Sequence, residues 1–369
     1  MKRNLRWSLV FSALAAGGLV FAYEQRSFGG MLLGLSPILI AASVLFKRLR
    51  SVLTVTISLV VAVALAEFVL GLGQQELVQL QLDADYWSRN DLGTVPSPGR
   101  HKARKVTAAG EVVYDVVYTI GDDSFRVTPG GNSSRPLRVN FLGCSVTFGD
   151  GLNDDQTLPA YVKQKMGDLQ VKNFGIHGFG MHQVLAILES KRDTSGQVNF
   201  LLTAPWHAER SACIPSFALG SPKFRLQTDG SVERDGVCGG IAYYPLARVL
   251  SFSRVYSLIK VALQPPQDVQ IDLYLALIQR IGELSKIRHQ QLIIGFVKAE
   301  ENWFAGRYNN ELIVQRLKGM NVEVIDVTLA DKAEATAAKY ILSRFDTHPT
   351  AAANEARATL VADAIRRGS

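Results

Sequence analysis

The chain has 369 residues, of which 47% are hydrophobic, and its 40 Lys and Arg outnumber its 33 Asp and Glu for a net charge of +7. That length allows about two domains. Six of the basic residues flank apolar stretches near the N-terminus, so the net charge is no nucleic-acid-binding signature and we expect no nucleic-acid partner.

Three stretches near the N-terminus are almost free of charge: residues 7–23, 31–46 and 51–73. The third is long enough to cross a bilayer, and the first two lie near the lower limit of about 17 residues. We therefore expect residues 1–73 to form a membrane anchor of three transmembrane helices in the lipid bilayer. A cleaved signal peptide over 7–23 is the alternative, but its apolar run would be long and no cleavage site precedes a soluble segment.

Charged residues beside these stretches predict their orientation. Basic residues occur at 2–6, before the first stretch, and at 47–50, between the second and third. By the positive-inside rule both sites are cytoplasmic, which places the chain after Gly73 in the periplasm of a bacterium, behind its inner membrane. Glu67 lies toward the outer end of the third stretch, where snorkelling or a helix–helix contact explains a costly carboxylate better than a functional role.

Residues 74–137 are predicted to be a linker with a small β hairpin. The polar segment 74–87 is expected to form a helical stem, and 95–105, with two prolines and a glycine, is expected to break regular structure. The run 111–120, rich in β-branched and aromatic residues, is expected to pair with 124–129 as the hairpin.

From residue 138 onward, short apolar runs alternate with amphipathic stretches. Strands are predicted at 138–142, 171–174, 199–202, 292–297 and 322–327. Helices are predicted at 158–166, 181–191, 269–289, 309–317 and 351–367. The alternation indicates an α/β fold, a three-layer α/β/α domain over 138–369 with a parallel sheet of about five strands. Binding sites in such domains lie at the carboxyl ends of the strands.

The segment 205–266 interrupts this alternation and is too long for an ordinary connection, so we expect a lid or a substrate-binding insertion. It contains Cys213 and Cys238, two of the three cysteines in the chain. In a periplasmic domain these two residues are candidates for a disulfide, and two reduced cysteines are the alternative.

The segment "FLGCSVTFGDGLNDDQTLP", residues 141–159, places Ser145 just after the first strand of this domain. A Ser hydroxyl there would lie at the binding edge of the sheet. It can act as a nucleophile when a base lies within hydrogen-bond reach and donors stabilise the oxyanion that forms. The alternative is a tight turn whose small residues serve steric needs alone.

The segment "RFDTHPT", residues 344–350, supplies a candidate base. His348 can take the proton of a nucleophile while Asp346 orients and stabilises its imidazolium. The alternative is that Asp346 caps the last helix and His348 is a solvated loop residue.

Glycines in "NFGIHGFGMHQ", residues 173–183, let backbone N–H groups approach a ligand closely, as an oxyanion hole requires. Their spacing does not fit a dinucleotide-binding fingerprint. His177 and His182 have no carboxylate or Cys cluster at metal-ligand spacing, and the acidic run 150–155 lacks the terminal Glu of a calcium loop. We therefore expect no cofactor and no metal, with helix capping as the role of the acidic run.

Together these segments resemble the SGNH/GDSL hydrolase family. "FLGCS" is similar to its first block, with Cys144 in place of Asp, "NFGIHG" to its second and "DTHP" to its last, in the same order along residues 138–365. The opening block also resembles that of membrane-anchored members found with polysaccharide biosynthesis and acetylation. The roles that the resemblance implies are nucleophile for Ser145, base for His348, orienting acid for Asp346, and oxyanion-hole amides for Ser145 and Gly178.

The sequence departs from the family pattern in two places. The third block normally supplies an Asn side chain to the oxyanion hole, but the end of the third strand reads "LLTAPWHAERS". His207 is the nearest substitute, with Arg210 nearby, and the alternative is that His207 packs under Trp206. The last block is Asp-x-His where many members have Asp-x-x-His.

The sequence therefore predicts a membrane-anchored serine esterase of the SGNH type. Its expected substrates are O-acyl groups, O-acetyl by resemblance, on a cell-surface or exported polysaccharide. Two alternatives stay open. An O-acetyltransferase would use the same site with a sugar hydroxyl in place of water, alongside a membrane-bound O-acyltransferase as a partner. A non-catalytic carbohydrate-binding or assembly subunit would keep the fold with a degenerate site.

Overall fold

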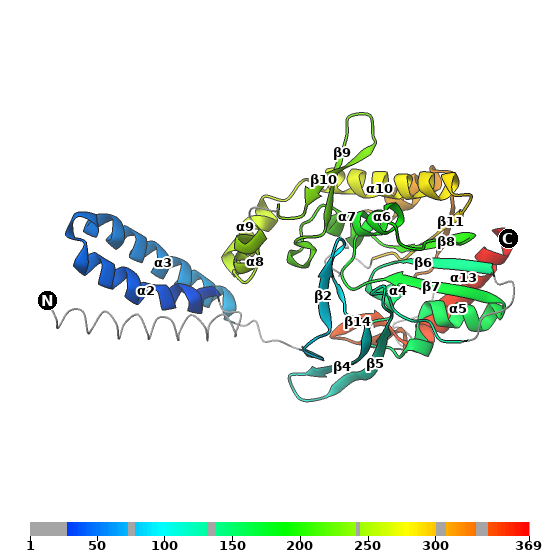
Figure 1. The fold of residues 1–369 in the computed structure, drawn as a ribbon, viewed down its shortest axis with the longest axis horizontal. Coiled ribbons are helices and arrows are strands. Elements are labelled where there is room, and N and C mark those ends of the chain that lie inside the picture. Colours follow the sequence, from blue (N-terminus) through cyan, green and yellow to red (C-terminus); the bar gives the residue numbers. More distant parts are fainter. Residues whose placement is uncertain are drawn as a thin grey trace. The chain divides into compact units, whose positions relative to one another are not determined.

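The computed structural model describes residues 28–72, 78–130, 137–240, 244–299, 308–329 and 339–368. They form two compact units (Figure 1). The first, which we call the apolar unit, consists of the N-terminal helices together with residues from 242–264. The second, the α/β unit, contains the remaining described residues. The first predicted membrane stretch, 7–23, lies outside the described residues.

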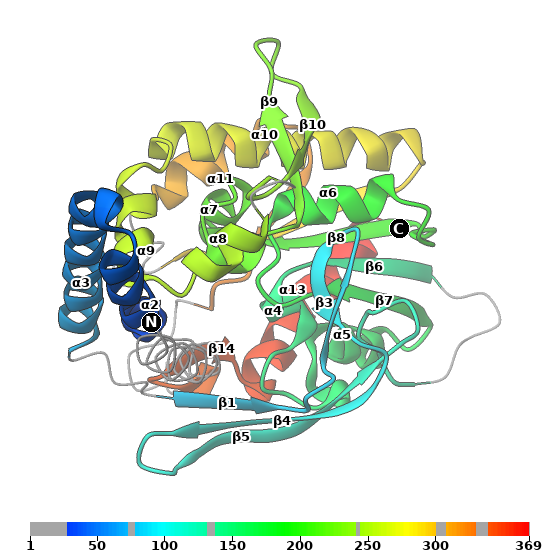
Figure 2. The same cartoon turned by 60° about the vertical axis from the view of Figure 1, so that its left-hand side comes forward.

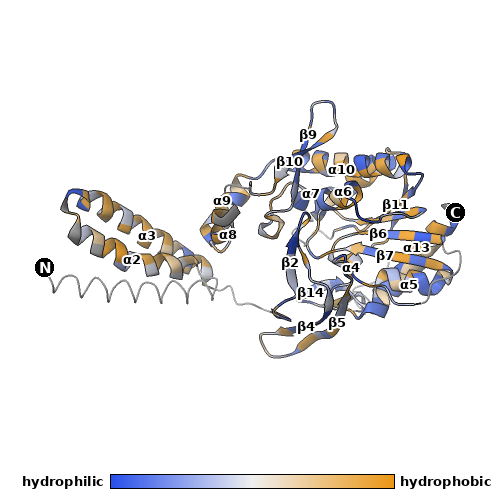
Figure 3. Ribbon diagram, viewed as in Figure 1, coloured by the Kyte–Doolittle hydropathy of each residue, from blue (hydrophilic) through white to orange (hydrophobic). Residues whose placement is uncertain are grey.

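The apolar unit contains two helices that form a hairpin. Helix α2 (Phe28–Leu45) and helix α3 (Arg50–Gly71) are joined by the short 3-10 turn Lys47–Leu49. Among the described residues, α3 is the one helix whose length and composition suffice to cross a membrane, and α2 adds a shorter apolar stretch, Phe28–Ile40. Figure 3, which is coloured by hydropathy, shows apolar residues along both helices. The second and third predicted stretches are thus helical.

Glu67 near the end of α3 contacts the start of another helix of the same unit, α9 (Arg254–Ala262). Its carboxylate accepts hydrogen bonds from the Ser253 hydroxyl and from the backbone N–H groups of Arg254, at 2.8 Å, and Val255, at 3.0 Å. The residue is only 1% exposed. A carboxylate there pairs with the otherwise unbonded N–H groups of a helix start, so the contact is of the helix–helix kind that the sequence favours.

We expect Glu67→Ala to loosen the first turn of α9, because Arg254 and Val255 would lose a charged acceptor worth about 1.5–3 kcal/mol per bond. Hydrogen exchange of the amides at 254–255 should accelerate by about tenfold or more. Glu67→Gln, which keeps one acceptor oxygen, should show a smaller acceleration. Mass-spectrometric exchange on the full chain measures both, and unchanged exchange in Glu67→Ala would contradict this role.

The segment 205–266 does not form a single insertion. Its last part, with α8 (Tyr244–Leu250) and α9, belongs to the apolar unit. Its first part stays in the α/β unit, where a disulfide joins Cys213 to Cys238 across a Cα–Cα distance of 5.4 Å. That part comprises α7 (Trp206–Ser211), η3 (Ser216–Ala218) and the hairpin β9 (Pro222–Leu226) and β10 (Val232–Val237).

The α/β unit is built on a sheet of five parallel strands in the order β12-β11-β8-β6-β7. All five lie where apolar runs predict them, since strands covered on both faces have few polar positions. Phe141, Phe200 and Ile293 are completely buried among them. The strands are β6 (Leu137–Gly143), β7 (Leu169–Gly175), β8 (Val198–Thr203), β11 (Gln291–Phe296) and β12 (Glu323–Asp326).

Helices cover both faces of this sheet, as Figure 2 shows. On one face lie α6 (Met181–Glu189) and α10 (Gln267–Ile287), with α11 (Asn310–Lys318) against α10. On the other lie α5 (Leu158–Met166) and α13 (Ala351–Gly368), which pack together. The predicted three-layer α/β/α fold is confirmed.

The segment 95–105 is not irregular, contrary to expectation. Strand β4 (Gly99–Thr107) pairs antiparallel with β5 (Val112–Ile120). In β4 the side chains of His101 and Ala103 are buried, whereas Arg100, Lys102 and Arg104 between them are exposed. Charges on alternate residues of a half-exposed strand hide its apolar face, which explains the error.

Two further expectations for this region are also wrong. The predicted helical stem contains β1 (Val78–Leu82), which pairs with β4, and the start of β2 (Trp87–Asn90), which pairs with β3 (Gly93–Pro96). Its alternating "VQLQL" is a strand pattern. The expected partner of β5 at 124–129 forms only isolated bridges through Arg126.

Candidate active site

Ser145 is the first residue of the short helix α4 (Ser145–Phe148), which begins just beyond the carboxyl end of β6. The turn into this helix is tight. A Cβ atom at Gly143 would overlap the Thr147 side chain and lie 2.9 Å from the carbonyl oxygen of Leu202. Glycine is required there by close approach, and the turn places Ser145 at the predicted binding edge of the sheet.

His348 connects Ser145 to Asp346. The Ser145 hydroxyl donates to His348 Nε2 across 2.9 Å, and His348 Nδ1 donates to Asp346 Oδ1 across 2.6 Å. Ser145 and Asp346 are each 5% exposed, whereas the His348 side chain between them is 30% exposed. The three residues that the sequence analysis proposed therefore meet in the geometry of a nucleophile, a base and an orienting acid.

The Asp-x-His spacing is explained by strand geometry. Asp346 and His348 lie on β14 (Asp346–Pro349), which pairs with β13 (Ile341–Ser343). Residues two apart on a strand project from the same face, so the carboxylate reaches the imidazole of the same strand. The alternative role of Asp346 as a helix cap is not realised, because the Thr350 hydroxyl accepts the Ala353 N–H at the start of α13.

Asp346 also pairs with a residue that the sequence analysis did not identify. Lys105 of β4 donates from Nζ to Asp346 Oδ2 across 2.8 Å. Burial raises the pKa of Asp346, but the hydrogen bonds and positive charges of His348 and Lys105 outweigh burial and hold that pKa below its usual range. Asp346 therefore stays ionised and can stabilise the His348 imidazolium. Both of its carboxylate oxygens are held in place.

A second carboxylate faces the base. Asp150 Oδ2 lies 3.6 Å from His348 Nε2, on the side of the ring that also contacts Ser145. Burial lowers the pKa of His348, but the hydrogen bond to Asp346 and the charges of Asp150 and Asp346 raise it above its ordinary value. The imidazolium formed when Ser145 loses its proton is thus stabilised from both ring nitrogens.

Asp150 is itself held by a further pair of residues. Its Oδ1 lies 2.5 Å from His177 Nδ1, and His177 Nε2 hydrogen-bonds to the hydroxyl of Tyr86, which is completely buried. Burial raises the pKa of Asp150, but the charges and hydrogen bond of His177, with the charge of His348, keep it below its usual value. Helix capping, the role that the sequence suggested for Asp150, is replaced by a contact with the base.

These charges predict a pH dependence. His348 acts as a base only when neutral, so kcat/KM for an ester should rise with pH through a His348 pKa above the ordinary value of about 6.5. Asp150→Asn removes a charge that raises this pKa, and the rise should move to lower pH. Asp229→Asn, at an exposed hairpin position, is the matched control and should leave the profile unchanged. A profile that does not move in Asp150→Asn would contradict the contact.

The candidate oxyanion-hole residues occupy different surroundings. Gly178 has φ of +72°, and a Cβ there would meet the Phe217 ring at 2.8 Å, so both conformation and space require glycine. His207 is 1% exposed and its Nδ1 accepts the Ala204 N–H at 3.1 Å. Burial lowers the pKa of His207, which is therefore neutral and lies beside Cys144. The centre of the His207 ring lies 5.9 Å from that of Trp206.

A cavity of about 340 Å³ opens beside the nucleophile. Ser145 and His348 line it together with apolar side chains and two arginines. The apolar side chains are Val146, Trp206, Val297 and Pro349, and the arginines are Arg210 and Arg357. The cavity is large enough for an acyl group or a sugar ring next to the reacting hydroxyl.

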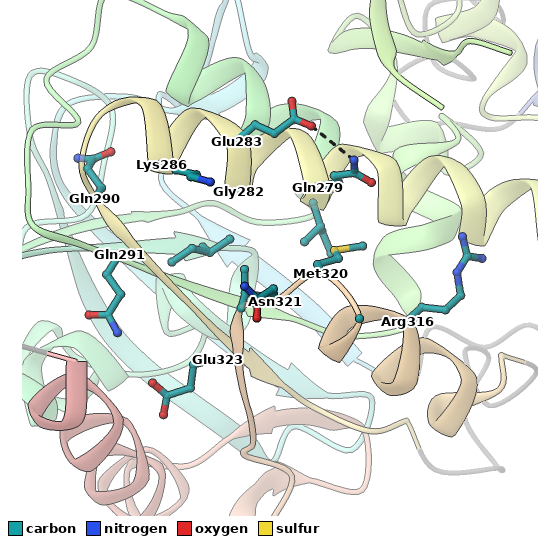
Figure 4. Close-up of a pocket in the computed structure, with 14 residues that line it drawn as sticks. Gln279, Gly282, Glu283, Lys286, Gln290, Gln291, Arg316, Met320, Asn321 and Glu323 are labelled. Atoms are coloured by element: carbon teal, nitrogen blue, oxygen red, sulfur yellow. Dashed lines mark hydrogen bonds between the residues drawn. The ribbon is translucent and has the colours of Figure 1, made fainter. Parts of the chain in front are cut away.

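A larger cavity of about 930 Å³ lies elsewhere on the α/β unit, shown in Figure 4. It is bounded by α10, where Gln279 hydrogen-bonds to Glu283, and by residues at the starts of two strands, Leu292 of β11 and Glu323 of β12. It therefore lies at the amino ends of the strands, opposite the edge that holds Ser145.

Sequence reasoning missed several residues of the site, and each had a weak signal. Lys105 lies in a stretch that was expected to be irregular, so no partner could be assigned to it. Asp150 stood in an acidic run whose residues also suit helix capping, and Arg357 stood within a predicted helix where arginines usually face water. Only the tertiary structure brings these three to Ser145 and His348.

Comparison with known proteins gave structural matches alone. No family model and no protein with a curated description matches the sequence. A putative lipolytic protein of the G-D-S-L family from Desulfitobacterium hafniense is similar over 62% of this chain and 98% of its own, at 13% identity and a TM-score of 0.39.

Two further solved structures show the same level of similarity. A GDSL-like lipase from Bacteroides thetaiotaomicron matches over 65% of this chain and 93% of its own, at 16% identity and a TM-score of 0.37. The psychrotrophic esterase EstA from Pseudoalteromonas sp. matches over 63% and 97%, at 10% identity and a TM-score of 0.37. At these values we infer the activity of this chain from its own site.

Proposed function

We propose that this protein is a serine esterase of the SGNH type that cleaves O-acyl groups, with O-acetyl groups of a polysaccharide as its expected substrates. The observation that supports the activity most directly is the chain of hydrogen bonds from Ser145 through His348 to Asp346, at 2.9 and 2.6 Å. The polysaccharide rests on the resemblance of the first sequence block alone.

The geometry supports a two-step reaction. Ser145 Oγ attacks the ester carbonyl while His348 Nε2 takes its proton, and Asp346 stabilises the resulting imidazolium. His348 then gives that proton to the leaving alcohol, and the acyl group remains on Ser145. Water attacks the acyl-enzyme and gives a proton to His348, which returns it to Ser145 Oγ as the acyl bond breaks and the carboxylic acid leaves. A sugar hydroxyl in place of water would make the same site an acyltransferase.

The assembled site disfavours a purely carbohydrate-binding role. A site that has lost catalysis has no need to keep the Ser145 hydroxyl on the base, or to hold Asp346 with Lys105 as well as His348. The missing Asn of the third block affects oxyanion stabilisation, and one oxyanion-hole donor is worth about 10²–10³ in kcat. Its loss slows such an enzyme without changing its chemistry.

Ser145→Ala should abolish the hydrolysis of 4-nitrophenyl acetate, with a loss on the order of 10⁴-fold or more in kcat, because the nucleophile is removed. A fluorophosphonate probe should label the parent chain at Ser145 and leave the variant unlabelled. Ser211→Ala, at a buried Ser on α7, is the matched control and should still be labelled.

Retention of hydrolysis by folded Ser145→Ala would exclude Ser145 as the nucleophile. Failure of the parent chain to label would support the binding role instead. Analysis of the products with and without an oligosaccharide acceptor then separates an esterase, which releases the free acid in both cases, from an acyltransferase, which needs the acceptor.

We also propose that α2 and α3 hold the protein in a bacterial inner membrane with its α/β unit in the periplasm. Helix α3 has the required length and composition, and the connection before it carries Lys47, Arg48 and Arg50.

The orientation can be tested with reporters. Alkaline phosphatase, which folds only in the periplasm, should be active when fused after Gly73 and inactive when fused after Arg48, because the positive-inside rule places the two sites on opposite sides of the membrane. The reverse pattern would contradict the proposed orientation.

A further inference from the structure

Two arginines line the cavity beside Ser145, and they come from different elements. Arg210 belongs to α7 and Arg357 to α13. Arg210 donates to the carbonyl oxygen of Phe179 across 3.3 Å, and its guanidinium lies 5.7 Å from the centre of the Phe217 ring. These contacts fix the side chain without neutralising its charge.

Arg357 is the more unusual of the two. It is only 8% exposed, although arginines are seldom buried unless a carboxylate pairs with them. Its Nε donates to the carbonyl oxygen of Val327 across 2.8 Å, and its buried Nη1 has no hydrogen-bond partner among the described residues. Burial alone lowers its pKa to about 10, so the guanidinium is still charged at neutral pH.

None of the described residues that line this cavity carries a carboxylate. The described residues that form its wall are apolar or neutral apart from His348 and the two arginines. The acids of the site, Asp150 and Asp346, are engaged with His177, His348 and Lys105. A buried cation left without an anion is costly to a folded protein, unless a ligand supplies the missing charge.

We propose that the cavity beside Ser145 recognises a carboxylate of the ester substrate, with Arg357 as its main partner and Arg210 as a second cation. This inference rests on the proposed esterase function and narrows its substrate class to anionic esters. A guanidinium presents a planar set of N–H donors that matches a carboxylate, and a pairing shielded from water is stronger than one at the surface.

The carboxylate could stand on either side of the ester bond. It would belong to the acyl group in a half-ester of a dicarboxylic acid, and to the alcohol in an acetylated uronic acid. Two pairs of substrates separate these sources. The first pair is the 4-nitrophenyl half-ester of succinic acid and its neutral methyl ester. The second is an O-acetylated methyl glucuronide and the corresponding neutral methyl glucoside.

The full chain in detergent should prefer the anionic member of at least one pair by about tenfold or more in kcat/KM, since hydrogen bonds between charged groups are stronger than those between neutral ones. Arg357→Gln should lower the ratio of anionic to neutral kcat/KM by about 10- to 100-fold, and Arg357→Lys should lower it less. Arg316→Gln on α11 is the matched control, because that exposed arginine pairs with Asp272 away from the site. The ratio of anionic to neutral kcat/KM in Arg316→Gln should equal that of the parent chain.

Equal rates within both pairs, or an undiminished ratio in Arg357→Gln, would overturn the proposal while leaving the esterase function in place. Should Arg357→Gln fail to fold, Arg210→Gln tests the second cation by the same ratio. Binding to Ser145→Ala provides a readout without turnover, by calorimetric titration of monomethyl succinate and methyl glucuronide against dimethyl succinate and methyl glucoside. If neither anion binds more tightly than its neutral counterpart, the proposal is overturned. This outcome does not depend on whether the protein is an esterase.

Discussion

The hydrogen bond between Ser145 and His348 joins positions 203 residues apart, and the rest of the site depends on it. It requires that β14, which pairs with β13 in a separate small sheet, approach the carboxyl end of β6 in the five-stranded sheet. It also requires β4, which precedes the sheet in the chain, to bring Lys105 to the far side of Asp346. Three separate parts of the α/β unit therefore fix the orientation of one imidazole ring.

The sequence predicts those parts of this arrangement that local patterns encode. The five buried strands are apolar runs in the sequence. Short segments with the order of blocks in a known family contain Ser145, Asp346 and His348. Strand β4 escapes such reasoning because its exposed face carries the charges of Arg100, Lys102 and Arg104, which mask the buried alternation of His101 and Ala103. The division of 205–266 between two units also escapes it, because no break in composition marks the change.

Asp150 shows why an electrostatic role is harder to predict than a fold. In the sequence it is one of several acidic residues that suit a helix start, and nothing local distinguishes it from Asp154 or Asp155. In the structure Asp154 pairs with Arg126, whereas Asp150 lies between His177 and His348. Asp150 lies in the turn after α4, whereas Asp154 begins the 3-10 turn Asp154–Gln156, so the two acids meet different parts of the tertiary structure.

The site separates its charges in space. The carboxylates Asp150 and Asp346 surround the base, and the arginines Arg210 and Arg357 line the cavity where a substrate would lie. The first group stabilises the imidazolium that forms during catalysis. In the described part of the chain each of these arginines donates to a backbone carbonyl oxygen but neither pairs with a carboxylate. Burying the charge of Arg357 costs folding free energy that an apolar side chain of similar size would not. Recognition of an anion therefore explains the buried Arg357 beside the nucleophile better than stability does. The free energy lost by burying its charge is regained only when an anionic substrate is bound.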